Sequence, residues 1–247
     1  MAVLPSLRAA PAAAGVQAPA LAPTFNAGNT ANTNTSETNH DITFSLGAGT
    51  NRVVVVSGFF QQASITWSSA TFYNGTTSDA SAGMTAVPAS PVTNTTATRI
   101  SLAAFLYAIP DAVAPGTKTV RLVTSGNVAV AQFVDCYNNL GATPADTEPL
   151  TVSGAQPTPV NATAGAGDLV ISFLGMDINQ SSASWAPTSG VIATRHLVAT
   201  SNAGDIMFAS ADGVVSAGTV NGGWTRGAGT PGGSLDMCVL VVVLPRL

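Results

Sequence analysis

The chain has 247 residues, of which 46% are hydrophobic and only 8% are charged, and its formal net charge at pH 7 is −4. Globular domains are typically about 25% charged, so this composition is typical of a membrane protein or of a surface buried by assembly. No run reaches the ~18–20 consecutive apolar residues that a membrane helix needs. The few basic residues are scattered, which argues against nucleic-acid binding. We expect neither a membrane protein nor a nucleic-acid binder.

Residues 1–40 differ in composition from the rest of the chain. Ala and Pro dominate as far as Pro23, and a polar tract rich in Asn and Thr follows at 26–40. Neither part has a strand or helix period, and alone the segment should be disordered. It lacks a basic start and is interrupted by prolines, unlike a signal peptide, so we expect synthesis and retention in a cytoplasm until assembly. We predict an extended arm that docks on a partner subunit, with a loosely placed tail as the alternative. The apolar side chains that would dock are Val3, Leu4, Leu7, Val16, Leu21 and Phe25.

From residue 41 onward the sequence predicts one strand after another. Ile42, Phe44 and Leu46 alternate with polar residues, and Arg52–Phe60 is a β-branched run typical of a strand buried on both faces. No segment of ten or more residues has an apolar helical period. Further strands are expected at 64–73, 100–109, 119–124, 128–137, 168–176, 190–199, 205–210 and 235–244. The predicted fold is all-β, a single antiparallel β-sandwich of residues 41–247 that is jelly-roll-like and carries an extended N-terminal arm.

The last apolar run, Met237–Leu244, would promote aggregation at the edge of a sheet. We therefore expect it in the middle of a sheet, paired with a run such as Arg52–Phe60, which would close a jelly-roll-like sandwich. Residues 139–166 have the composition of a linker and leave a two-domain arrangement open. One sandwich is favoured, because each half alone would offer only four or five strands.

The sequence contains no convincing catalytic or metal site. Only His40, in the polar arm, and His196, on one face of a strand, could act as a base, and for His196 a satisfied or surface histidine is favoured over a catalytic one. Asp146 and Glu148 form the only close acidic pair, in a proline-bounded loop that favours solvation over glycoside hydrolysis or calcium binding. We predict no catalytic residue, no cofactor and no metal.

Two cysteines, Cys136 and Cys238, lie inside strand-like runs. Buried free thiols are favoured over a disulfide, which stays possible between neighbouring strands.

Tryptophan and arginine on loops are the candidates for contact with a partner or a sugar. Trp224 and Arg226 lie in the glycine-rich stretch 222–233, which we expect to be a mobile surface loop. Trp185 is expected to pack, with contact as the alternative. If these aromatic side chains and Tyr137 shared an exposed face, they could stack on sugar rings.

Several short motifs together carry a family resemblance. They are Asn51–Val56, Tyr73-Asn74-Gly75 with Met84-Thr85, Leu106–Pro110, Gly116–Val123, Ala129–Asn138, Gly167–Val170 and Val239–Pro245. Over about residues 41–245 the chain resembles jelly-roll or lectin-like β-sandwich domains of the virion structural proteins of tailed bacteriophages and phage-like particles. The resemblance implies a non-enzymatic subunit without catalytic residues.

The expected function is therefore that of a virion structural protein, a capsid decoration or head-spike or fibre subunit, in a virion assembled in the host cytoplasm. It would contact other virion proteins through its arm and form a homo-oligomer such as a trimer. The alternative is a carbohydrate-binding adhesin module that attaches a particle or cell to surface glycans. A glycan-degrading enzyme that uses Asp146, Glu148 or Asp177 is the least favoured option.

Overall fold

The computed structural model describes residues 20–95, 100–153, 159–177, 185–200, 206–226 and 236–247, and within these ranges the chain is all β. The docking residues Val3, Leu4, Leu7 and Val16 lie outside the described residues. No helix long enough to cross a membrane occurs in the described ranges. The predicted all-β, antiparallel fold is confirmed.

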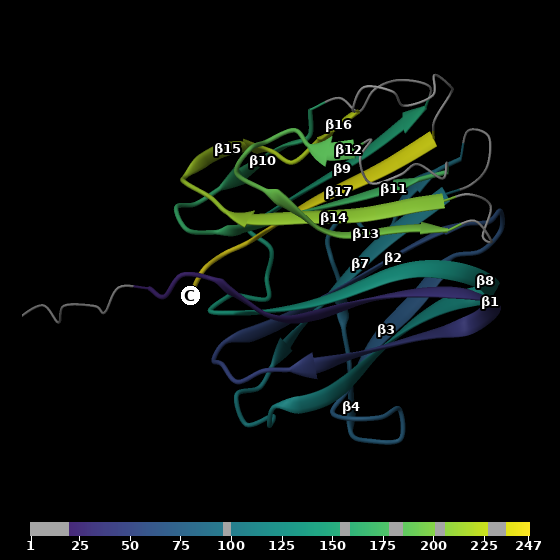
Figure 1. Cartoon of the computed structure of the whole chain (residues 1–247), viewed down its shortest axis with the longest axis horizontal. Coiled ribbons are helices and arrows are strands. Elements are labelled where there is room, and N and C mark those ends of the chain that lie inside the picture. Colours follow the sequence, from purple (N-terminus) through teal and green to yellow (C-terminus); the bar gives the residue numbers. More distant parts are fainter. Residues whose placement is uncertain (1–19, 96–99, 154–158, 178–184, 201–205, 227–235) are drawn as a thin grey trace, which may run out of the picture.

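The first half of the chain forms one eight-stranded sheet. Its strands are β1 (Thr24–Leu46), β2 (Arg52–Gln61), β3 (Trp67–Tyr73), β4 (Ser81–Gly83), β5 (Thr85–Ala86), β6 (Val92–Asn94), β7 (Ile100–Ile109) and β8 (Gly116–Asn138). The long strand β8 pairs with β1 along its length, while its first part also pairs with β3 and its last part with β2. The sheet therefore bends over itself, with β3 and β4 forming the outermost layer in Figure 1.

The second half forms a five-stranded sheet in the order β13-β14-β11-β17-β9, with two small two-stranded sheets, β10–β15 and β12–β16. The strands are β9 (Asp146–Ser153), β10 (Asn161–Ala164), β11 (Leu169–Met176), β12 (Trp185–Pro187), β13 (Ala193–Thr200), β14 (Ile206–Val214), β15 (Gly218–Asn221), β16 (Trp224–Arg226) and β17 (Asp236–Leu244). Figure 1 shows the small sheets on the side of this sheet that faces away from β2 and β7.

Side chains of the central strands alternate between two buried faces, and this explains why these strands are apolar on both faces. In β2, Val53, Val55 and Phe59 face the core between the two large sheets, whereas Val54 and Val56 face the folded-over part of their own sheet. The strand β17 repeats this pattern, because one of its faces joins the core between the sheets and the other packs under the small sheets. Both faces of these strands are thus removed from water, as for a central strand of a layered fold.

Aromatic rings fill the centre of the core between the sheets. The ring of Phe208 on β14 stacks on Phe133 of β8 at 4.2 Å between centroids, and lies 6.0 Å from Phe59 and 6.4 Å from Phe173. Glycine at position 175 of β11 leaves the space that the Phe59 ring occupies. The two halves of the chain therefore share one core and form a single sandwich.

The final strand lies in the middle of a sheet, as the sequence predicts, but its predicted pairing is wrong. The strand β17 pairs with β11 and β9, whereas Arg52–Phe60 lies in the other large sheet, between β7 and β8. Each sheet takes its strands from one half of the chain, so these two apolar runs face each other across the core.

The predicted boundary between arm and sandwich at residue 40 is also wrong. Residues 24–40 belong to β1, which pairs with β8 from Thr24 opposite Asn138 to Leu46 opposite Gly116. The polar tract forms a strand because the long partner strand supplies its hydrogen bonds and only one of its faces meets apolar side chains. His40, expected in a polar arm, is buried.

The two cysteines are buried free thiols, as the sequence predicts. Cys136 lies on β8 and Cys238 on β17, in different sheets. Burial raises the pKa of each thiol to about 12, so neither is a ready nucleophile in the folded protein.

The only lysine of the chain, Lys118, is 4% exposed and lies on β8 opposite Phe44 of β1. Burial lowers the pKa of its amine, and the nearby Arg52 lowers it further. We expect an amine-acylating reagent to modify Lys118 at least about tenfold more slowly in the folded chain than in denaturant. Peptide mass spectrometry gives both rates, and a short lysine-containing peptide under the same two conditions is the control. Equal rates for Lys118 in the folded and the denatured chain would contradict its burial.

Candidate functional site

A cluster of charged and aromatic side chains lies where the edges of the two large sheets meet. Strand β13, the edge of the second sheet, lies beside β1 and β8 of the first sheet (Figure 1). We call this set the seam cluster; its members are Phe25, Asp135, Tyr137, Arg195, His196 and Asp212. In a chain with so few charges, this is the first place to look for chemistry.

Asp135 and His196 connect the two sheets directly. His196 Nε2 lies 2.7 Å from Asp135 Oδ1, and the His196 ring stacks on Phe133 at 5.1 Å. Asp135 is 3% exposed, and burial raises the pKa of its carboxyl group, an effect that the hydrogen bond to His196 opposes. A buried carboxylate needs such a partner, since an unpaired one would be costly.

Arg195 forms the second link across the seam. Its guanidinium pairs with both carboxylate oxygens of Asp212, at 2.8 and 2.7 Å, and lies 3.9 Å above the ring of Phe25 on β1. A register shift in β13 between Thr194 and His196 lets two consecutive side chains, Arg195 and His196, serve the same seam. In a regular strand they would point to opposite faces.

The arrangement does not assemble a nucleophile. Ser210 lies opposite His196 in the register, but its hydroxyl is buried and forms no hydrogen bond. A serine nucleophile needs a base within hydrogen-bond reach and access for a substrate. The contacts of His196 with Asp135 and of Arg195 with Phe25 join the edges of the two sheets, and His196 has a hydrogen-bond partner, one of the two states expected for it.

The tryptophans considered for sugar contact are buried. Trp224 lies on β16, not on a mobile loop, and is 1% exposed, and its Nε1 donates to Ser172 Oγ at 2.8 Å. Trp185, its neighbour on β12, is 5% exposed, and Tyr137 is 1% exposed. Arg226, opposite Trp185 in the register, is half-buried. The two tryptophan rings pack between the small sheets and the outer face of β11 and β17, and Tyr137 lies in the core between the two large sheets. None of these rings is therefore available for stacking on a ligand.

The acidic pair lies in a strand and not in the predicted loop. Asp146 and Glu148 belong to β9, and Asp146 accepts hydrogen bonds from the backbone amides of Thr147 and Thr163, at 2.9 and 2.6 Å. Asp177 likewise accepts the amide of Asp236 at 3.0 Å. Among the described residues, no group of three or more His, Cys, Asp or Glu side chains could hold a metal ion.

Sequence reasoning missed the seam cluster. Its one visible signal is the pair Arg195-His196, two cationic or polar residues in succession inside an otherwise apolar strand. The partners Asp135 and Asp212 are 60 and 17 residues from Arg195, and only the fold brings them together.

A substitution at Gly28 would test the packing of the seam cluster. A Cβ there would meet the Asp135 carboxylate and would lie 3.0 Å from both Phe25 Cζ and the Val134 carbonyl oxygen. We expect Gly28→Ala to lower the free energy of unfolding by about 1–3 kcal/mol, because Asp135 must move from His196. Urea unfolding measures this, with Gly83→Ala as the control, since a Cβ there meets nothing within 4 Å. Equal effects of the two changes would contradict the seam geometry.

Comparisons of the chain with protein-family models, curated proteins and solved structures found no match.

Proposed function

We propose that the chain is a non-enzymatic structural subunit of a virus-like particle, a capsid decoration or a head-spike or fibre subunit. It would be attached through the end of the sandwich at which its described termini lie. The observation that carries the proposal is the position of its exposed apolar side chains.

The exposed large apolar residues of the described ranges gather at this attachment end. They are Leu21, Phe25, Val191, Val214 and Leu247. Asn139 joins the two termini, because its side chain donates to the Ala22 carbonyl at 2.9 Å and its carbonyl accepts the Leu247 amide at 3.1 Å. Phe25 and Val214 line one small cavity, and Val191 adjoins Gly213. An apolar patch confined to one end is typical of a surface that contacts another protein.

The remaining surface is nearly neutral, because many of the charges are buried. Among the residues that the structure describes, the buried charged ones are Arg52, Lys118, Asp135, Asp168, Asp212 and Asp236. Thr, Ser, Asn, Ala and Gly supply most of what is left. Surface charge keeps a free soluble domain from associating with other copies, whereas a subunit held in an assembly does not need this repulsion.

Sugar binding by aromatic stacking receives no support, since Trp185, Trp224 and Tyr137 are buried. The resemblance to virion β-sandwich domains favours the assembly role, and so does the attachment end. The seam cluster is also consistent with an assembly role, because its contacts join the edges of the two sheets.

The test is the copy number of the chain in particles purified from the source of the sequence, measured by quantitative mass spectrometry against the major shell protein. Hundreds of copies per particle would support a decoration subunit, and a few copies would support a vertex spike or fibre. Copurification below one copy per particle would overturn the proposal.

A further inference from the structure

We propose that an apolar groove along the outer edge of β7 binds the N-terminal segment, residues 1–19, of a second copy of this chain. The inference rests on the assembly role proposed above, and it names the site and the occupant. It can be tested on the purified chain alone, so it can fail while the particle proposal stands.

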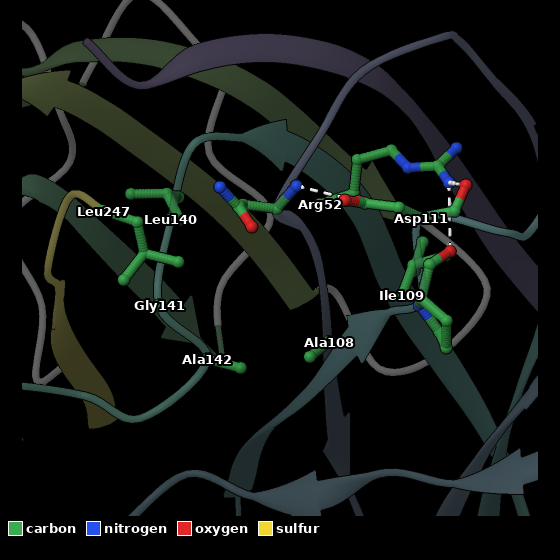
Figure 2. A pocket seen from close by; sticks show the side chains of 10 residues that line it. Arg52, Ala108, Ile109, Asp111, Leu140, Gly141, Ala142 and Leu247 are labelled. Atoms are coloured by element: carbon green, nitrogen blue, oxygen red, sulfur yellow. Dashed lines mark hydrogen bonds between the residues drawn. The ribbon is translucent and has the colours of Figure 1, made fainter. Parts of the chain in front are cut away.

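The groove, called the β7 groove, consists of two adjoining cavities that share Ala108 and Ala142. Each has a volume of about 380 Å³. The first lies between β7 and residues 140–142, and Figure 2 shows Leu247 beside Leu140 at one side of it. The second continues along β7 past Leu106 and Tyr107 and is closed by Pro88 and Pro144. The combined lining is mostly apolar, with Arg52 and Asp111 at the first end.

The outer edge of β7 along this groove is paired except at one backbone position. Strand β7 pairs with β2 over its whole length, but on its other side β6 covers only Ile100–Leu102 and β5 only Phe105–Leu106. The amide of Val87 donates to the Ala104 carbonyl on this side. Because backbone groups alternate along an antiparallel strand, the next outward positions after Ala104 are Leu106 and Ala108. Leu106 is paired with Thr85, and Ala108 has no strand partner on that side in the described part of the chain.

A short extended segment could occupy such an edge. It would add one strand beside Ala108 and place apolar side chains in the two cavities, which is the usual way in which a sheet edge binds a peptide. Only one outward backbone position is free, so the segment can contain prolines without losing many hydrogen bonds.

The segment 1–19 has the matching chemistry. It contains Ala, Pro, Val and Leu, and Arg8 is its only charged side chain. The first cavity is lined by one carboxylate side chain, that of Asp111, which lies beside Arg52 on the side opposite Leu247 (Figure 2). Fully extended, 19 residues reach at most about 65 Å, which is enough to cross to a neighbouring sandwich.

The path of the chain favours the groove of a second copy over its own. Residues 20–22 lie at the edge of the sandwich beside the C-terminus (Figure 1), and Leu21 is 64% exposed. An exposed apolar side chain at this point favours a contact with another copy. The attachment end and the first cavity adjoin, since Leu247 belongs to both, so two copies can exchange segments with short connections.

The experiment mixes two full-length proteins. One is unlabelled and carries a photo-crosslinking amino acid in place of Leu7, and the other is ¹⁵N-labelled. After irradiation, mass spectrometry identifies which residues are joined and whether the two peptides come from different chains. We expect crosslinks between unlabelled segment 1–19 and ¹⁵N-labelled residues 85–88, 106–111 or 140–144.

Matched variants of the ¹⁵N-labelled chain decide where the segment binds. Ala108→Arg and Thr143→Arg, both at exposed positions of the groove, should reduce the crosslink yield at least tenfold. Ala186→Arg, at an exposed position on β12 outside the groove, should leave it within twofold. Two results would overturn the proposal: crosslinks that join only residues of the same chain, and an intermolecular yield that neither groove variant lowers.

Discussion

Replacing Phe208 with alanine is expected to lower the free energy of unfolding by about 3–5 kcal/mol. This ring is fully buried and lies among Phe59, Phe133 and Phe173, so three rings from both large sheets lose their common neighbour. The substitution would leave a cavity at the contact between the two sheets. The hydrogen bonds within each sheet do not compensate for the lost packing between the sheets. Urea unfolding monitored by circular dichroism measures the loss.

A matched aromatic residue on the surface provides the control. Phe25 is 42% exposed and contacts Tyr137 and Arg195 at the edge of the sandwich, so Phe25→Ala should cost only about 1 kcal/mol. If both changes cost the same, the two sheets would not share the core described above.

Acidification from pH 7 to pH 4 is expected to destabilise the protein by up to about 3 kcal/mol through His40 alone. Burial lowers the pKa of this imidazole from 6.5 to about 4, and the charge of Asp41 opposes the change only in part. Below pH 6.5 the unfolded chain takes up a proton at His40 that the folded chain does not. Stability is therefore lost as the pH falls through this window, until the folded state is protonated as well near pH 4.

The variant His40→Gln removes the titration and keeps a polar group beside the Thr124 hydroxyl, which lies 3.2 Å from His40 Nε2. Unfolding free energies at pH 7 and pH 4.5 should differ clearly less for this variant than for the wild type. His196→Gln serves as a control at the other histidine. An unchanged pH dependence in His40→Gln would show that His40 is not the group responsible.

The sequence reveals the strands that are buried on both faces but not their partners. The runs Arg52–Phe60 and Met237–Leu244 are mainly apolar, and the structure places both in sheet interiors. Their pairing could not be predicted, because hydrophobicity indicates how deep a strand lies and not which neighbour it has. The choice of neighbour depends on contacts between distant parts of the chain.

Two other errors have the same origin. Residues 24–40 have the composition of a disordered segment, yet they form part of β1 because β8 is long enough to pair with all of it. The glycines around Trp224 suggest a loop. In the structure, Gly222 lets its backbone lie close to β17, because a Cβ at this position would collide with Val241. The seam cluster depends on a bulge at Arg195. A bulge changes how two strands are aligned, and amino-acid composition does not predict that alignment.

The assignment of each large sheet to one half of the chain has a consequence for synthesis on the ribosome. All eight strands of the first sheet are translated before β9 and leave the ribosome ahead of it, so its folded-over layer can begin to close around Val54, Val56 and Val134 before the second sheet has emerged. The other face of this sheet, which carries Phe59 and Phe133, stays exposed until the second half of the chain covers it. The nascent chain thus exposes an apolar, aggregation-prone surface until β17, which follows the other strands of the second sheet in the chain, is in place.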